Sequence, residues 1–220
     1  MARLSDLIGG GGVLPSELIY FTESKQWVTP SDGWVRAMII SGGGINGTTF
    51  GTSTGGGGGG ASAIAVLRWR KILQGQVLGI IIGAAGTANV NNGNGGVSFL
   101  NTPWGYCSAA PGEHGENGTA ENYGLGGAGG IAGDGADYYL PGGNGGLGAG
   151  GSHYTTGNMG TINPYGTGPI GPMATVQLTG VFGLNSQTAF TYGNGAGTKD
   201  DSTVYAARPG FAAIEFCAAF

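Results

Sequence analysis

The stretch GEHGENGTAENYGLGGAGGIAG, residues 112–133, has glycine at every third position except 121, where a glutamate stands. A second series of the same period runs over 142–151. A period of three matches polyproline II geometry, which has three residues per turn. Glycine is costly to order and has no side chain to bury, so a regular repeat indicates that backbones touch at these positions. The spacing predicts left-handed extended glycine helices that pack side by side and bond backbone to backbone.

Glycine fills 52 of the 220 positions, and a glycine-rich chain has two other common interpretations. A disordered chain is poor in aromatic and β-branched residues, but this chain has nine Tyr, eight Phe and four Trp and is 40% apolar. Collagen needs an unbroken Gly-X-Y repeat with abundant proline, and here the repeat breaks at Glu121 and Ala136. The composition therefore favours an ordered chain that is not collagen.

Charge is scarce, because only 9% of the residues are Asp, Glu, Lys or Arg and the net charge is −4. The sequence has no basic patch, which disfavours nucleic-acid binding. No apolar stretch is long enough to span a bilayer, and no apolar run of signal-peptide length precedes Gly9, so we expect neither membrane insertion nor a secretion signal. A surface so poor in charge is sticky on a free monomer, which predicts that much of it is covered in an assembly.

Short apolar runs on both sides of the glycine-rich region predict strands rather than helices. In the run over 34–40, Val35, Ala37 and Ile39 fall on one face and Arg36, Met38 and Ile40 on the other. We expect an all-β fold, a small β-sandwich base with an inserted region of packed polyglycine II-like helices and long loops over about 111–172. Residues 17–220 then form one glycine-rich β domain. The expected strands are 18–22, 34–40, 63–71, 77–82, 97–100, 173–182 and 211–217, with 72–75 as a hairpin connection between the third and fourth.

Residues 1–16 differ in pattern from the rest of the chain. Leu4, Leu7 and Ile8 have helix-like spacing, and Gly9–Gly12 then interrupt it. One interpretation is an anchor peptide that docks on another protein through these three apolar side chains. The other is a frayed terminus, and the sequence leaves both open.

The sequence contains no convincing catalytic, nucleotide or metal motif. Gly55–Gly60 is followed by no lysine and leads into a strand, unlike a phosphate loop. No hydrolase signature surrounds His114 or His153, and the aspartates near Gly133 lack the tandem repeat of calcium-binding nonapeptides. We therefore expect a protein that is not an enzyme and that needs no metal or cofactor. Two cysteines, Cys107 and Cys217, favour buried free thiols, although a bridge between them stays open.

Aromatic side chains fall in the gaps between glycine runs, where rods of glycine would turn. Tyrosine and tryptophan bring a large contact area at a small entropic cost, so they suit recognition loops. They equally suit packing on the glycine layer or against a neighbouring subunit. The candidate receptor-binding residues are Trp104, Tyr106, Tyr138, Tyr139, His153, Tyr154 and Tyr165.

Several of these features together resemble a known family. FTESKQW at 21–27, a strand over 34–40 and the glycines at 42–44 are followed by a second glycine cluster and strand over 55–71, and the chain closes with RPGFAAIEF at 208–216. This order is similar to the glycine-rich domain of bacteriophage tail proteins, including the T-even-like tail-fibre adhesins. The resemblance implies polyglycine II helices whose exposed loops contact the host, in a virion tail component made in the host cytoplasm. The fibre analogy also implies a homotrimer.

The function expected from these arguments is host-surface recognition by a non-catalytic tail-fibre or tail-tip adhesin. Its partners would be a bacterial cell-surface receptor, other tail proteins contacted through the N-terminus, and further copies of the chain. The main alternative is a purely structural tail or capsid decoration subunit that contacts no receptor. A polysaccharide depolymerase and an ice-binding protein made of glycine helices are weaker alternatives.

Overall fold

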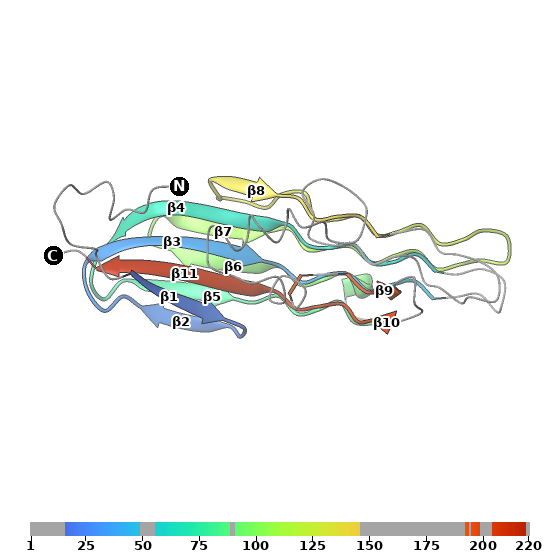
Figure 1. Ribbon diagram of the computed structural model, residues 1–220, viewed down its shortest axis with the longest axis horizontal. Coiled ribbons are helices and arrows are strands. Elements are labelled where there is room, and N and C mark those ends of the chain that lie inside the picture. The colour runs from blue at the N-terminus through green and yellow to red at the C-terminus, as the bar shows by residue number, and fades with distance from the viewer. Residues whose placement is uncertain are drawn as a thin grey trace.

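The computed structural model describes residues 16–48, 56–88, 91–145, 192–193, 195–198 and 204–218. The described chain is nearly all β, with a five-stranded sheet in the order β1-β11-β3-β4-β8, a four-stranded sheet in the order β2-β5-β6-β7 and a two-stranded ribbon (Figure 1). All the pairings are antiparallel. The elements are β1 (Ser16–Phe21), β2 (Lys25–Val28), β3 (Gly33–Ile40), β4 (Ile64–Ile72), β5 (Val77–Ile81), η1 (Asn91–Gly93), β6 (Ser98–Thr102), β7 (Gly105–Ala109), β8 (Tyr138–Leu140), β9 (Gly197–Thr198), β10 (Val204–Tyr205) and β11 (Phe211–Ala218).

The two larger sheets pack face to face around one apolar core. Ala37 and Ile39 of β3 join Leu78 of β5 and Leu100 of β6 in a single buried cluster. Side chains alternate across each strand, so one face of each sheet supplies this layer. The prediction that Val35, Ala37 and Ile39 share one face of their strand is confirmed, since all three lie in this core.

The opposite face of β3 is buried as well. Met38 and Ile40 belong to a second buried cluster with Val66 of β4 and Phe211 of β11. Arg36 lies on the same face and forms an ion pair with Glu215 of β11. The five-stranded sheet is therefore apolar on both faces, which is the pattern of a sheet that is covered on both sides.

Several details of the strand assignment differ from expectation. The 72–75 connection is not a hairpin, because β4 belongs to the five-stranded sheet and β5 to the four-stranded sheet. The turn instead carries the chain from one layer to the other. The sequence analysis also missed β2, β7, β8, β9 and β10. In β2 and β7, polar residues, glycine or serine interrupt the apolar run, and β8, β9 and β10 are only two or three residues long. The strand expected at 173–182 lies outside the described residues.

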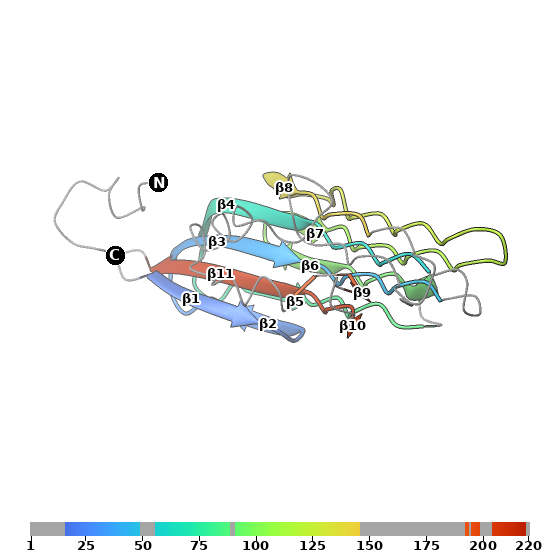
Figure 2. The ribbon, with the colours of Figure 1, turned by 45° about the vertical axis from the view of Figure 1, so that its right-hand side comes forward.

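Beyond the sheets, several strands continue into extended glycine-rich segments that run side by side in both views (Figure 1, Figure 2). Their N–H groups bond to neighbouring segments at intervals of three residues. Gly112, Gly115 and Gly118 all donate to the 42–48 segment, at 3.0, 2.9 and 2.9 Å. The residues that follow Gly112 and Gly115 donate to the 123–133 segment instead, at 2.9 and 2.8 Å. Successive amides thus point at different neighbours.

In these segments, the glycines that face a neighbouring segment stand where a side chain has no room. A Cβ atom on Gly127 or Gly130 would overlap the backbone carbonyl of Glu113 or Ala110, at a separation below 3.0 Å that real Cβ atoms essentially never show. The non-glycine positions between them point elsewhere, and Ile131 is 76% exposed. The period of three in the sequence therefore marks the row of each segment that faces a neighbouring backbone.

The series over 112–133 is made of two rows rather than one. Thr119 donates its N–H to the carbonyl of Asn122 at 2.8 Å, and the chain reverses direction there. The row before this turn faces the 56–63 segment, whereas the row after it faces the 110–118 segment. Segments at 42–48, 56–63, 83–86 and 93–96 share the bonding pattern, so it also occurs outside 111–172.

We expect Gly127→Ala to lower the free energy of unfolding by about 2–3 kcal/mol, because the added methyl group would force the Glu113 carbonyl away. Urea denaturation measures this change. The matched control is Gly79→Ala in β5, where the nearest atom to an added Cβ is Asn101 Cβ at an ordinary 3.5 Å. The control should change stability by less than about 1 kcal/mol. Equal losses in the two variants would contradict the proposed role of the bare backbone contact.

Candidate recognition surface

The 119–122 turn is the described segment that extends farthest from the sheets (Figure 1, Figure 2). Besides the backbone bond across the turn, the Thr119 hydroxyl accepts the N–H of Asn122 at 3.0 Å. The Asn117 side chain accepts the N–H of Thr48 at 2.8 Å and so ties the base of the turn to the 42–48 segment. These bonds hold the turn at the end of the paired segments 110–118 and 123–133.

The side chains at this distal turn are exposed and polar or aromatic. Glu121 and Asn122 are exposed, and Tyr123 is 51% exposed. The charged residues between 110 and 133 are three glutamates, Glu113, Glu116 and Glu121, so the paired segments and their turn are acidic. Tyr123 was not among the candidates from the sequence, although it lies in the gap at which glycine is missing from position 121.

Trp104 and Tyr106 lie at the end of the sheets that is opposite to the glycine segments. The expectation that these two residues stand where a glycine segment turns is therefore wrong. Trp104 is in the turn between β6 and β7, which leads back into the strands rather than into glycine segments. The Tyr106 ring packs against Phe99 with 5.2 Å between centroids. Both side chains are exposed, at 42% and 44%.

Tyr138 and Tyr139 form β8 rather than a turn, and they pair with Val66 and Ala65 of β4. The Tyr139 hydroxyl accepts the N–H of Ala136 at 3.0 Å, and burial raises the pKa of this phenol. Tyr138 is 37% exposed. Within this pair Tyr139 has a structural contact and Tyr138 faces the surface. Among the other candidates, His153, Tyr154, Tyr165, Leu4, Leu7 and Ile8 lie outside the described residues.

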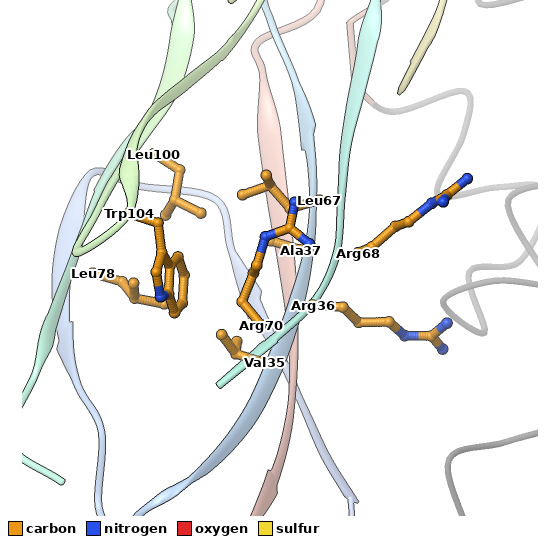
Figure 3. A pocket seen from close by; sticks show the side chains of 9 residues that line it. All are labelled: Val35, Arg36, Ala37, Leu67, Arg68, Arg70, Leu78, Leu100 and Trp104. Atoms are coloured by element: carbon orange, nitrogen blue, oxygen red, sulfur yellow. The ribbon is translucent and has the colours of Figure 1, made fainter. Parts of the chain in front are cut away.

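Trp104 also borders a hollow between the two sheets. Figure 3 shows its indole facing Arg70 across the gap, with Leu100 and Leu78 on the same side, while Arg36 and Arg68 point away. The hollow has no room for a water molecule, and its empty volume of about 190 Å³ includes open solvent. Core side chains such as Ala37 and Leu78 line it together with Trp104 and Arg70, and it offers no cavity for a small substrate.

The rim of the hollow carries an ion pair between Arg70 and Asp137. Asp137 also accepts the backbone N–H of Arg68 at 2.7 Å. Burial acts to raise the pKa of Asp137, but the hydrogen bonds and positive charges of Arg68 and Arg70 outweigh it and hold this pKa below its usual value. This ion pair joins the residue before β8 to β4, next to the three residues of β4 with which β8 pairs.

The two cysteines and His114 are at least partly buried. Cys107 and Cys217 are buried and unbridged, as the composition favoured. Burial and the nearby carboxylate of Asp137 raise the pKa of Cys107 to about 12, and burial raises the pKa of Cys217. His114 is half-buried. Among the described residues, no three His, Cys, Asp or Glu side chains gather as a metal site, and no helix is long and apolar enough to cross a membrane.

Comparison of the chain with protein-family models and with curated proteins gives no match.

We expect neither Cys107 nor Cys217 to react rapidly with a disulfide reagent such as DTNB in the native protein at pH 8. A pKa of about 12 leaves a thiolate fraction of about one in 10⁴ at Cys107 under these conditions, and both sulfurs are buried. The absorbance of the released thiolate should report two thiols in urea and almost none without it. A fast-reacting native thiol would contradict the burial of one of the two sulfurs.

Asp137→Asn should lower stability at pH 7 by about 1 kcal/mol or less, because it removes a partly exposed ion pair. The folded pKa of Asp137 is depressed, so its contribution is present above the unfolded pKa and is lost as the pH falls through the lower folded value. The stability gap between variant and wild type should therefore close in acid. Urea denaturation across this range measures the gap, with the exposed Glu113→Gln as control. A gap that widens in acid would refute the assignment.

Proposed function

We propose that the protein is a bacteriophage tail-fibre or tail-tip adhesin that recognises the host surface without catalysis. One observation carries the proposal: the paired segments 110–118 and 123–133 hold an exposed turn far from both sheets, on a base made of backbone hydrogen bonds. This arrangement suits a projecting recognition element. The order of motifs that resembles phage tail proteins gives the biological setting.

We further propose that the glycine segments are polyglycine II-like helices, including those within 111–172. The support is the bonding interval of three residues, which polyproline II geometry produces because it has three residues per turn. A second support is that inward positions are glycines at which a Cβ atom would overlap a neighbouring carbonyl. Bundles of such helices need no side-chain core, so they suit a thin projection.

Recognition by this protein would rest on contact alone. Tyr123 supplies an exposed aromatic anchor, and Asn122 and Glu121 beside it supply hydrogen-bonding groups. Tyrosine loses little conformational entropy on binding, and a turn that is already held in place loses less than a mobile loop does. Trp104, Tyr106, Tyr138, His153, Tyr154 and Tyr165 remain candidates for receptor contact.

The proposed setting is the virion tail, with synthesis in the host cytoplasm. Leu4, Leu7 and Ile8 are the proposed contacts with other tail proteins. Several copies, three in the fibre analogy, would add avidity. Once one copy has bound, the linked copies are held near the surface at a high effective concentration. The partner at the far end is a bacterial cell-surface receptor.

Tyr123→Ala in assembled phage should lower the adsorption rate by about tenfold, the loss expected for one aromatic anchor. Particle number and morphology by electron microscopy should not change, because this side chain is exposed. The control is Ile131→Ala, which removes a more exposed apolar side chain from the same segment away from the turn. Failed particle assembly would favour the structural-subunit alternative, and normal adsorption would count against a receptor site at this turn.

A further inference from the structure

The outer face of the four-stranded sheet, called here the open face, presents apolar side chains to solvent. Alternate residues of its strands point outward, and Val28, Val77 and Tyr106 among them are 55%, 43% and 44% exposed. Val28 lies directly opposite Val77 across β2 and β5, and Ile81 continues the face at 37% exposed. Val28 and Val77 make one apolar pair, and Ile81 lies opposite Phe99 of β6, whose ring packs against Tyr106, in a second apolar group.

The outer face of the other sheet is built differently. Its central apolar residues Met38, Ile40 and Ala213 are 1%, 1% and 0% exposed, and its exposed apolar side chains are Tyr20 in β1 and Trp34 at the start of β3, at 48% and 38%. The centre of that face is thus covered within a single chain, whereas the open face has exposed apolar side chains on β2, β5 and β7. Exposed apolar side chains gathered on one face mark interaction sites.

The open face also lacks charge. The outward positions of β2, β5, β6 and β7 hold no Asp, Glu, Lys or Arg. Its centre is Gly79, flanked across the strands by the amides Gln26 and Asn101. The arginines that could attract a charged partner, Arg36 and Arg68, point away from the space between the sheets, on the five-stranded side (Figure 3).

We propose that the open face is the contact between copies of this chain. Contact between two identical patches brings like charges together, so a patch without charge meets its own copy at no electrostatic cost. Amides both donate and accept hydrogen bonds, so Gln26 and Asn101 can pair with the same residues of another copy. The depletion of charge together with exposed apolar side chains is also typical of homo-oligomer interfaces.

The size of the open face sets the strength of the contact. Four strands about 4.8 Å apart, with about five residues each, cover roughly 300 Å² in projection. A stable interface buries about 800 Å² per partner. The contact is therefore weak and depends on concentration, which suits copies held together in one particle. Two stacked faces or three around an axis would both cover it. This inference rests on the multi-copy part of the proposed function.

Sedimentation of the purified full chain over a concentration series tests the contact. The wild type should rise above the 21.7 kDa monomer mass with concentration. Val77→Lys with Ile81→Lys should weaken association at least tenfold. The control pair Leu125→Lys with Ile131→Lys, at positions that are more exposed but lie in the glycine segments, should associate as the wild type does. A wild type that stays monomeric to about millimolar, or equal loss in both pairs, overturns the proposal and leaves the open face to another partner.

Cross-linking gives a second readout that does not depend on the lysine variants folding. Gly79→Cys adds a thiol at the centre of the open face, where a Cβ atom fits at 3.5 Å from its nearest neighbour, and the two native thiols are buried. Mild oxidation should join two chains through this residue, whereas Leu125→Cys should not cross-link above background. No joined product, or equal yields, overturns the proposal. Neither assay involves host cells, so self-association and host adsorption can fail independently.

Discussion

The contact of one bare backbone with another is the interaction on which the glycine-rich part of this protein depends. The 42–48 segment shows the demand most clearly, because it bonds to six other stretches of chain, through Gly60, Gly86, Gly96, Gly112, Ala196 and Arg208. A strand in a sheet has two neighbours and keeps its side chains above and below. A segment that has neighbours on all sides has no space for side chains on the rows that face them. Its buried N–H and C=O groups reach their partners only where no Cβ atom keeps the two backbones apart.

Buried serines connect the two kinds of packing. The Ser41 hydroxyl, at the end of β3, donates to the Ala109 carbonyl and accepts the N–H of Ser98, both at 2.6 Å. The Ser98 hydroxyl in turn accepts the N–H of Gly83 at 2.8 Å. These bonds join β3, β5, β6 and β7 where the sheet ladder stops and the three-residue interval begins. Small hydroxyl side chains suit this layer, since they fill little space and pair the groups that the ladder no longer reaches.

The local patterns of the sequence predicted which residues share a row or a face, but not where the chain reverses direction or passes from one sheet to the other. Alternation placed Val35 and Met38 on opposite faces, and the interval of three identified positions where a Cβ atom has no room, such as Gly127. The interval of three continues through the reversal at 119–122, so what looks like one glycine series in the sequence belongs to two antiparallel segments. Whether β4 and β5 share a sheet depends on contacts between layers, which no local pattern encodes. Tyr123 went unnoticed for the same reason, because its exposed position beside a turn follows from the reversal of the chain.

The bundle also restricts where this protein can carry chemistry. In the 123–133 segment, the row Gly124, Gly127 and Gly130 faces the 110–118 segment. Gly129 in the next row is also blocked, because its Cβ atom would overlap the Gly142 carbonyl. The third row, Leu125, Ala128 and Ile131, is exposed along its length, and Ala132 at the end of the second row is exposed too. Around Gly127 and Gly129 a single row is therefore left for side chains of any type, so the turns are the places in this part of the protein that suit a larger group of adjacent side chains.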